Sequence, residues 1–121
     1  MKREKREIIT IADNGTVTIP NNVRMSIGEI AGLFGIYYRT AKRHIRAIEK
    51  SGIVRGDDSM GCIVDGRHIY PEYYGLDMVI ALAFQVQSKN AEIFREWLCK
   101  KAARKEIPEM PVISVQNYML N

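Results

Sequence analysis

Two short segments of helical pattern, each ended by a glycine, follow one another in the first half of the chain. Ser26 and Glu29 have the spacing of a capping box, in which each side chain satisfies a backbone amide of the other residue. The pattern predicts a helix over about 27–34 that Gly35 ends, then a helix over 38–50 that a second glycine ends. A tight turn between two such helices is typical of a helix-turn-helix unit.

The predicted helix 38–50 has two unlike faces. One is a core stripe at helical spacing, formed by Ala41, Ile45 and Ile48. The other is basic and carries Arg39, Lys42, Arg43, Arg46 and Lys50. Against one acidic residue, these five give residues 39–50 a net charge of +4, equal to that of the whole chain. Such a concentrated charge indicates an anionic partner, although a solvated face is the alternative.

Strands are predicted on either side of the two helices. Asn14-Gly15 lies between two β-rich runs within residues 8–19, which predicts a hairpin with a type I′ turn. After the second helix, Ile53-Val54 and the apolar runs flanking Asp65-Gly66 predict the strands of a wing over 53–70. No helix precedes the helix-turn-helix. We therefore expect the helices near the C-terminus to take the place of that missing packing partner.

The C-terminal part is helical in pattern over 76–106 and ends in an apolar tail, 107–121. Residues 76–86 are almost all apolar, and Ser88 is a suitable N-cap for the last helix. In that helix we expect Ile93, Phe94, Trp97 and Leu98 to face inward and Lys89, Arg95, Lys100, Lys101 and Arg104 to face outward. A length of 121 residues favours one domain, 1–121. The predicted class is α+β, a winged helix-turn-helix with an N-terminal β-hairpin and C-terminal helices.

Several stretches of the sequence resemble known families. Residues 39–54 are similar to the recognition helix and first wing strand of bacterial winged-helix repressors. The segments 65–67, 74–81, 86–89 and 94–97 resemble the C-terminal half of the RhuM-like family, and 29–35 followed by His44-Ile45 resembles its N-terminal half. This resemblance covers about residues 26–100. It implies a DNA-associated role of the kind found in bacterial mobile elements and pathogenicity islands.

The sequence departs from winged-helix proteins at the candidate site. Tyr37 stands where a recognition helix usually has a serine or threonine N-cap, and the wing is net acidic, with Arg67 beside its turn. The residues expected to contact DNA are Tyr37, Tyr38, Arg39, Lys42, Arg43, Arg46, Lys50 and Arg67. Of these, Arg43 and Arg46 are expected to point away from the core stripe.

Other classes of function have little support in the sequence. His44, Cys62, His68 and Cys99 lack the close spacing of a zinc site, so we expect no metal. No phosphate-binding glycine loop or nucleophile motif is present, so we expect no enzyme, cofactor or small-molecule ligand. The longest apolar run, 78–84, is far shorter than a membrane span, and the charged N-terminus does not resemble a secretory leader. Two cysteines in no close pair favour a reducing compartment, so we expect a cytoplasmic protein.

The sequence therefore predicts a protein that binds double-stranded DNA through helix 38–50, as a small transcriptional regulator or a mobile-element accessory factor. We expect a homodimer, joined through the C-terminal helices or the tail, because two related helices read two half-sites. A fold of the tail back onto the N-terminal hairpin is the alternative. For the function itself, the alternatives are a protein–protein interaction module and an RNA-binding protein.

Overall fold

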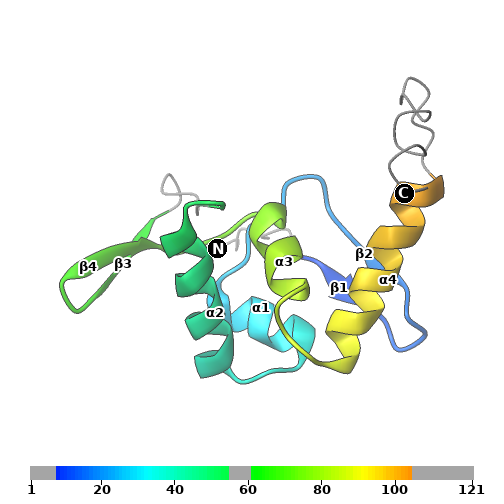
Figure 1. Cartoon of the computed structure of the whole chain (residues 1–121), viewed down its shortest axis with the longest axis horizontal. Coiled ribbons are helices and arrows are strands. Elements are labelled where there is room, and N and C mark those ends of the chain that lie inside the picture. Colours follow the sequence, from blue (N-terminus) through cyan, green and yellow to red (C-terminus); the bar gives the residue numbers. More distant parts are fainter. Residues whose placement is uncertain (1–7, 55–60, 105–121) are drawn as a thin grey trace, which may run out of the picture.

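The computed structural model describes residues 8–54 and 61–104, and these form an α+β protein of four helices and two small antiparallel hairpins (Figure 1). In chain order the elements are β1 (Thr10–Ile11), β2 (Val17–Thr18), α1 (Ile27–Phe34), α2 (Tyr38–Ser51), β3 (Cys62–Asp65), β4 (His68–Pro71), α3 (Leu76–Ala83) and α4 (Lys89–Arg104). The expected tail lies outside the described residues.

The N-terminal hairpin is present, but its turn is not type I′. Ile11 pairs with Val17, so the connection is longer than two residues. The Gly15 amide donates to the Ala12 carbonyl at 2.8 Å, and Gly15 has a φ of 89°, whereas no described non-glycine residue has a positive φ. This is the pattern of a type I turn followed by a left-handed glycine, a common longer hairpin connection.

The boundaries of α1 and α2 agree with the prediction. The Ser26 amide donates to Glu29 Oε1 at 2.9 Å and the Glu29 amide donates to Ser26 Oγ at 3.2 Å, so both halves of the capping box are made. Gly35 ends α1 with a φ of 66°, and Gly52 ends α2 with a φ of 81°; both are in the left-handed region that glycine adopts without strain.

The C-terminal helices α3 and α4 pack against α1 and α2, as expected from the absence of a predicted helix before Ser26. The rings of Phe34 in α1 and Phe94 in α4 meet edge to face at 5.7 Å, and both side chains are buried. Ser88 caps α4 by accepting from the Ala91 amide at 3.0 Å. Arg95 was expected to face outward, and that is wrong: it is half-buried and donates to the carbonyls of Ala83 (2.7 Å) and Val86 (3.1 Å). The Ala83 carbonyl belongs to the last turn of α3 and Val86 follows that helix, and a cation is favourable at a helix C-terminus.

The turn of the second hairpin lies one residue further along the chain than predicted. Asp65 pairs with His68, so the two-residue loop is Gly66-Arg67 rather than Asp65-Gly66. Gly66 still has the expected positive φ, 69°, and a glycine at the first loop position suits a type II′ turn. Ile53-Val54 forms no strand, because the chain bends there directly after α2. The hairpin projects beyond α2, on the side away from α4 (Figure 1).

Candidate nucleic-acid interface

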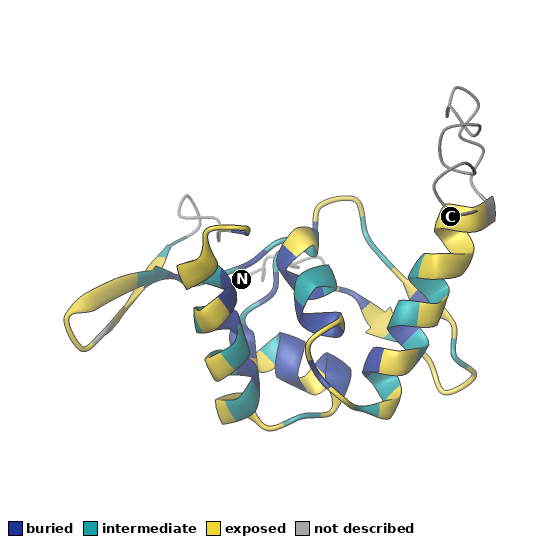
Figure 2. Ribbon diagram, viewed as in Figure 1, coloured by how far each residue is buried: buried dark blue, intermediate teal, exposed yellow. Residues whose placement is uncertain are grey.

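The two faces of α2 differ as its sequence predicts. Ala41 and Ile45 are fully buried and Ile48 is 7% exposed, so this stripe fixes the helix to the core. On the opposite side Arg39, Arg43 and Lys50 are exposed. They are separated by four and seven residues, which places them along one line of the helix surface. Figure 2 shows the outer side of α2 exposed along most of its length.

The N-terminus of α2 presents two aromatic rings to solvent. Tyr37 is 82% exposed and Tyr38 is 52% exposed. Tyr37 occupies the N-cap position but makes no side-chain cap hydrogen bond, as its phenol group predicts. Arg39 follows directly, so a guanidinium and two phenol groups meet where α2 begins. These groups can donate to phosphates and base edges.

The eight predicted contact residues do not all share this surface. Tyr37, Tyr38, Arg39, Arg43, Lys50 and Arg67 are exposed, and Lys42 is half-buried. Arg67 lies apart from α2, in the loop of the β3–β4 hairpin. Arg46 was expected to point away from the core, and that is wrong: its side chain is only 18% exposed and is held by other parts of the protein.

Arg46 lies between two tyrosines and a glutamate. Its Nη1 donates to the Tyr74 hydroxyl at 2.9 Å and to Glu49 Oε1 at 3.2 Å. Its guanidinium carbon lies 3.5 Å from the centre of the Tyr70 ring in β4, the geometry of a cation–π contact. Sequence reasoning missed Tyr70 and Tyr74 as its partners. The spacing of Arg46 and Glu49 was the one available signal, since residues three apart are neighbours on a helix.

Tyr74 connects this cluster to the core. Its backbone forms an antiparallel bridge with Met25, just before α1, through hydrogen bonds of 2.8 and 3.0 Å. Its side chain is fully buried, and that burial, together with the negative charge of Glu49, raises the pKa of Tyr74 to about 12. The hydroxyl is therefore protonated at neutral pH while it accepts a hydrogen bond from Arg46.

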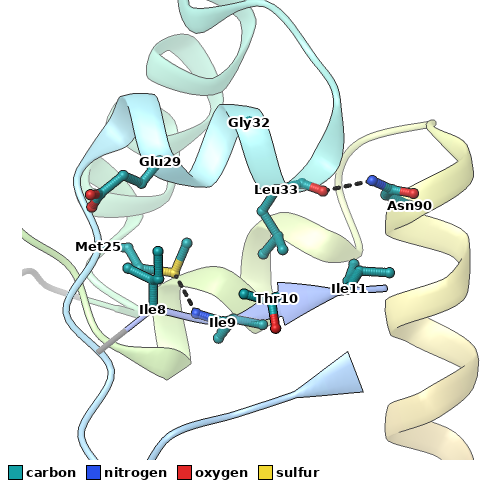
Figure 3. Close-up of a pocket in the computed structure, with 9 residues that line it drawn as sticks. All are labelled: Ile8, Ile9, Thr10, Ile11, Met25, Glu29, Gly32, Leu33 and Asn90. Atoms are coloured by element: carbon teal, nitrogen blue, oxygen red, sulfur yellow. Dashed lines mark hydrogen bonds between the residues drawn. The ribbon is translucent and has the colours of Figure 1, made fainter. Parts of the chain in front are cut away.

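A separate hollow of about 310 Å³ lies between β1, α1 and the start of α4 (Figure 3). Its walls include the aliphatic side chains Ile8, Ile11 and Leu33 and several polar groups. Two of the polar side chains at its edge serve the fold: Glu29 completes the capping box, and Asn90 donates to the Leu33 carbonyl at 2.9 Å. The third, Thr10, is exposed.

Within the described ranges, no group of three or more histidine, cysteine, aspartate or glutamate side chains could hold a metal ion. Among the same residues, no helix is both long and apolar enough to cross a membrane. Compared with protein-family models, curated proteins and solved structures, the chain matches none of them.

Proposed function

We propose that this protein binds duplex DNA, with α2 in the major groove and the β3–β4 loop against the neighbouring backbone, in the manner of a winged helix-turn-helix. The observation that carries the proposal is that α2 has two different faces. One is a buried apolar stripe, and the other is an exposed basic line formed by Arg39, Arg43 and Lys50. A helix that binds in the major groove needs both faces, because the apolar face must hold it to its domain while the basic face contacts the DNA.

The dimensions of the basic line suit the groove. Arg39 and Lys50 are eleven residues apart, which corresponds to about 16 Å along a helix axis at ~1.5 Å per residue. The major groove is about 12 Å wide and has phosphates on both edges. Arg39 and Lys50 are thus spaced to reach opposite edges, while Arg43 lies between them and can reach the bases.

The biological role that fits this binding is a small transcriptional regulator or a mobile-element accessory factor. The resemblance to the RhuM-like family over residues 26–100 supports that class. A homodimer fits it too, since two-fold related helices contact half-sites about one turn of DNA apart.

The outer face of α4 supports such a dimer. Glu92 and Glu96 are exposed near its start and Lys100 is exposed further along, beside Phe84, which is 57% exposed. Two copies of α4 packed antiparallel would place Glu96 of each near Lys100 of the other and cover the Phe84 rings. Unlike charges that meet in this way favour one orientation of the partners.

The salt dependence of binding tests the DNA proposal. For about 3–5 phosphates neutralised per monomer, log K against log salt has a slope of about −3 to −4.5 on random-sequence duplex DNA. We expect Arg39→Gln with Lys50→Gln to reduce the steepness by about 1.8, because each lost phosphate contact removes about 0.9. The control, Lys89→Gln with Lys101→Gln on α4, removes the same charge and should leave the slope unchanged. Equal slopes for both pairs would refute a role for α2.

Protein binding is the second candidate function, and the hairpin favours it. Val64 and Ile69 pair across β3 and β4 and are 72% and 68% exposed, an apolar pair on a projecting element. Under this alternative the salt slope on duplex DNA is shallow and the α2 variants bind like the parent. Competition with structured and single-stranded RNA separates the RNA alternative, which predicts that RNA displaces the duplex at equal concentration.

A further inference from the structure

The contact between the projecting hairpin and the body of the protein depends on few side chains. Along β3 and β4 the side chains of Cys62, Val64, His68 and Ile69 are exposed. At the base of β4, Pro71 is buried and Tyr70 is half-buried, and the Tyr70 ring lies against the Arg46 guanidinium. The angle of the hairpin to α2 is therefore set close to Tyr70, at the base of β4.

An arginine at this point does more than fill space. The Arg46 side chain is largely buried, and its Nε has no hydrogen-bond partner within the described structure. Removing such a charge from water is costly, and an apolar side chain of similar size often packs there equally well or better. A guanidinium, however, is planar. It can stack on one ring and donate in its own plane to a second group, so it fixes both position and orientation.

The two partners of Arg46 belong to different parts of the fold. Tyr70 is in the hairpin, whereas Tyr74 is fully buried and bridged to Met25 before α1. The guanidinium on α2 thus joins the hairpin to the core through one stacked contact of 3.5 Å and one hydrogen bond of 2.9 Å. Glu49, one turn further along α2, holds the same nitrogen at 3.2 Å and limits the rotamers open to Arg46.

We propose that Arg46 is a positioning residue, which holds the β3–β4 hairpin at a fixed angle to α2 so that Arg67 and the basic line of α2 meet the same DNA duplex. The proposal rests on the proposed function. Arg67 is three residues from Tyr70, about 10 Å along a strand. A rotation of about 20° at Tyr70 would then move the start of the loop by roughly 3–4 Å, enough to break a phosphate hydrogen bond.

The native cysteines allow a direct measurement of the hairpin angle. The chain has two, and both are exposed: Cys62 is in β3 and Cys99 is in α4. Spin labels on them, with labelled chains diluted in unlabelled chains so that distances between subunits do not contribute, report the distance from hairpin to body by double electron–electron resonance, without DNA. We expect one narrow distance distribution for the parent and a distribution at least twice as broad for Arg46→Met. Arg43→Met, the matched control on the exposed side of α2, should leave the distribution narrow.

A second variant distinguishes loss of the contact between Arg46 and Tyr70 from a general loss of structure. Tyr70→Leu removes the stacked ring from the hairpin and leaves α2 unchanged, so it should broaden the distribution as Arg46→Met does. Circular dichroism melts identify any variant that is unfolded at the temperature of the measurement. A narrow, unshifted distribution in a folded Arg46→Met or Tyr70→Leu protein would overturn the positioning role, whether or not the protein binds DNA.

DNA binding then tests whether the contact of Arg67 with DNA depends on Arg46. In the parent, Arg67→Ala should lower the steepness of the salt slope by about 0.9, the loss of one phosphate contact. In the Arg46→Met background the same substitution should change neither slope nor affinity, because the loop is no longer held against the duplex. An undiminished effect of Arg67→Ala in that background refutes the coupling. If the parent shows no salt-dependent binding at all, the proposed function fails, while the spin-label result still decides whether Arg46 positions the hairpin.

Discussion

The raised pKa of Tyr74 makes the stability of this protein depend on pH in the alkaline range. Burial and the charge of Glu49 raise the pKa of this phenol from 10.0 to about 12. In the unfolded chain Tyr74 loses its proton near pH 10, whereas in the folded protein it keeps the proton to higher pH. Its contribution to the free energy of unfolding is therefore complete below about pH 10, and it is lost as pH rises through 10 toward 12.

The size of the effect follows from the shift. One pKa unit corresponds to about 1.4 kcal/mol, so a shift of about two units contributes up to roughly 3 kcal/mol, of which about 2 kcal/mol is lost by ~pH 11.5. The pH dependence of the parent protein sums contributions from the whole chain, so a reference protein is needed to isolate that of Tyr74. Tyr74→Phe provides the reference, because it removes this one titration and keeps the ring in the core.

Urea unfolding followed by Trp97 fluorescence, at intervals from pH 8.5 to 11.5, measures the difference between the two proteins. At pH 8.5 we expect Tyr74→Phe to be less stable by about 1.5–3 kcal/mol, because it loses a hydrogen bond from the charged Arg46. That difference should shrink by about 2 kcal/mol as pH rises to 11.5. A difference that stays constant over this range would refute the argument that burial holds the proton on Tyr74.

Three further predictions concern stability and assembly. Ser26→Ala should lower the free energy of unfolding by about 1 kcal/mol in a thermal melt, because it breaks the capping box, whereas an unchanged melt would contradict that assignment. Gly66→Val should cost more than ~1 kcal/mol, because the φ of 69° strains a β-branched residue, while Gly32→Ala in α1, where a Cβ has open space, should cost nothing. Light scattering should give about twice the monomer mass for the full chain, and a chain ending at Glu109 should stay dimeric if α4 forms the interface. A monomer at tens of micromolar would reject the dimer.

The elements that the sequence predicted best are those with local causes. The capping box and the glycine at the end of each helix act within a few residues, so α1 and α2 could be placed almost to the residue. The core stripe of α2 was predictable for the same reason, because helical periodicity alone brings Ala41, Ile45 and Ile48 together. The class of the protein, α+β, followed from these helices and from two glycine-marked hairpins.

The turns of the hairpins were less predictable, because more than one turn suits the same residues. Asn14-Gly15 fits a type I′ turn, but a type I turn with a left-handed glycine uses the same dipeptide and leaves a longer loop. In the second hairpin, pairing of Asp65 with His68 moves the loop to Gly66-Arg67 and places an arginine directly in it. The conformation of Gly66 was predictable, whereas the register depended on pairing between the strands.

Arg46 and Arg95 show why charge alone does not identify a contact surface. Both are basic residues on amphipathic helices, and both were placed on the exposed side. Each is instead drawn inward by groups distant in sequence, Tyr74 for Arg46 and the Ala83 carbonyl for Arg95. A long side chain can reach over the edge of its helix, so its place on a helical wheel fixes where it starts and not where its charge lies.

The basic residues of α2 accordingly have different roles. Arg39, Arg43 and Lys50 begin opposite the buried stripe, and they are exposed. Arg46 begins nearer the hairpin, close enough for its guanidinium to meet Tyr70. Under the proposed function, Arg39, Arg43 and Lys50 contact the DNA, and Arg46 fixes the angle of the hairpin that carries Arg67. Loss of Arg39 or Lys50 should weaken binding by a similar factor on every sequence, and loss of Arg43 should also change the preference among sequences. Loss of Arg46 should remove the contribution of the hairpin alone.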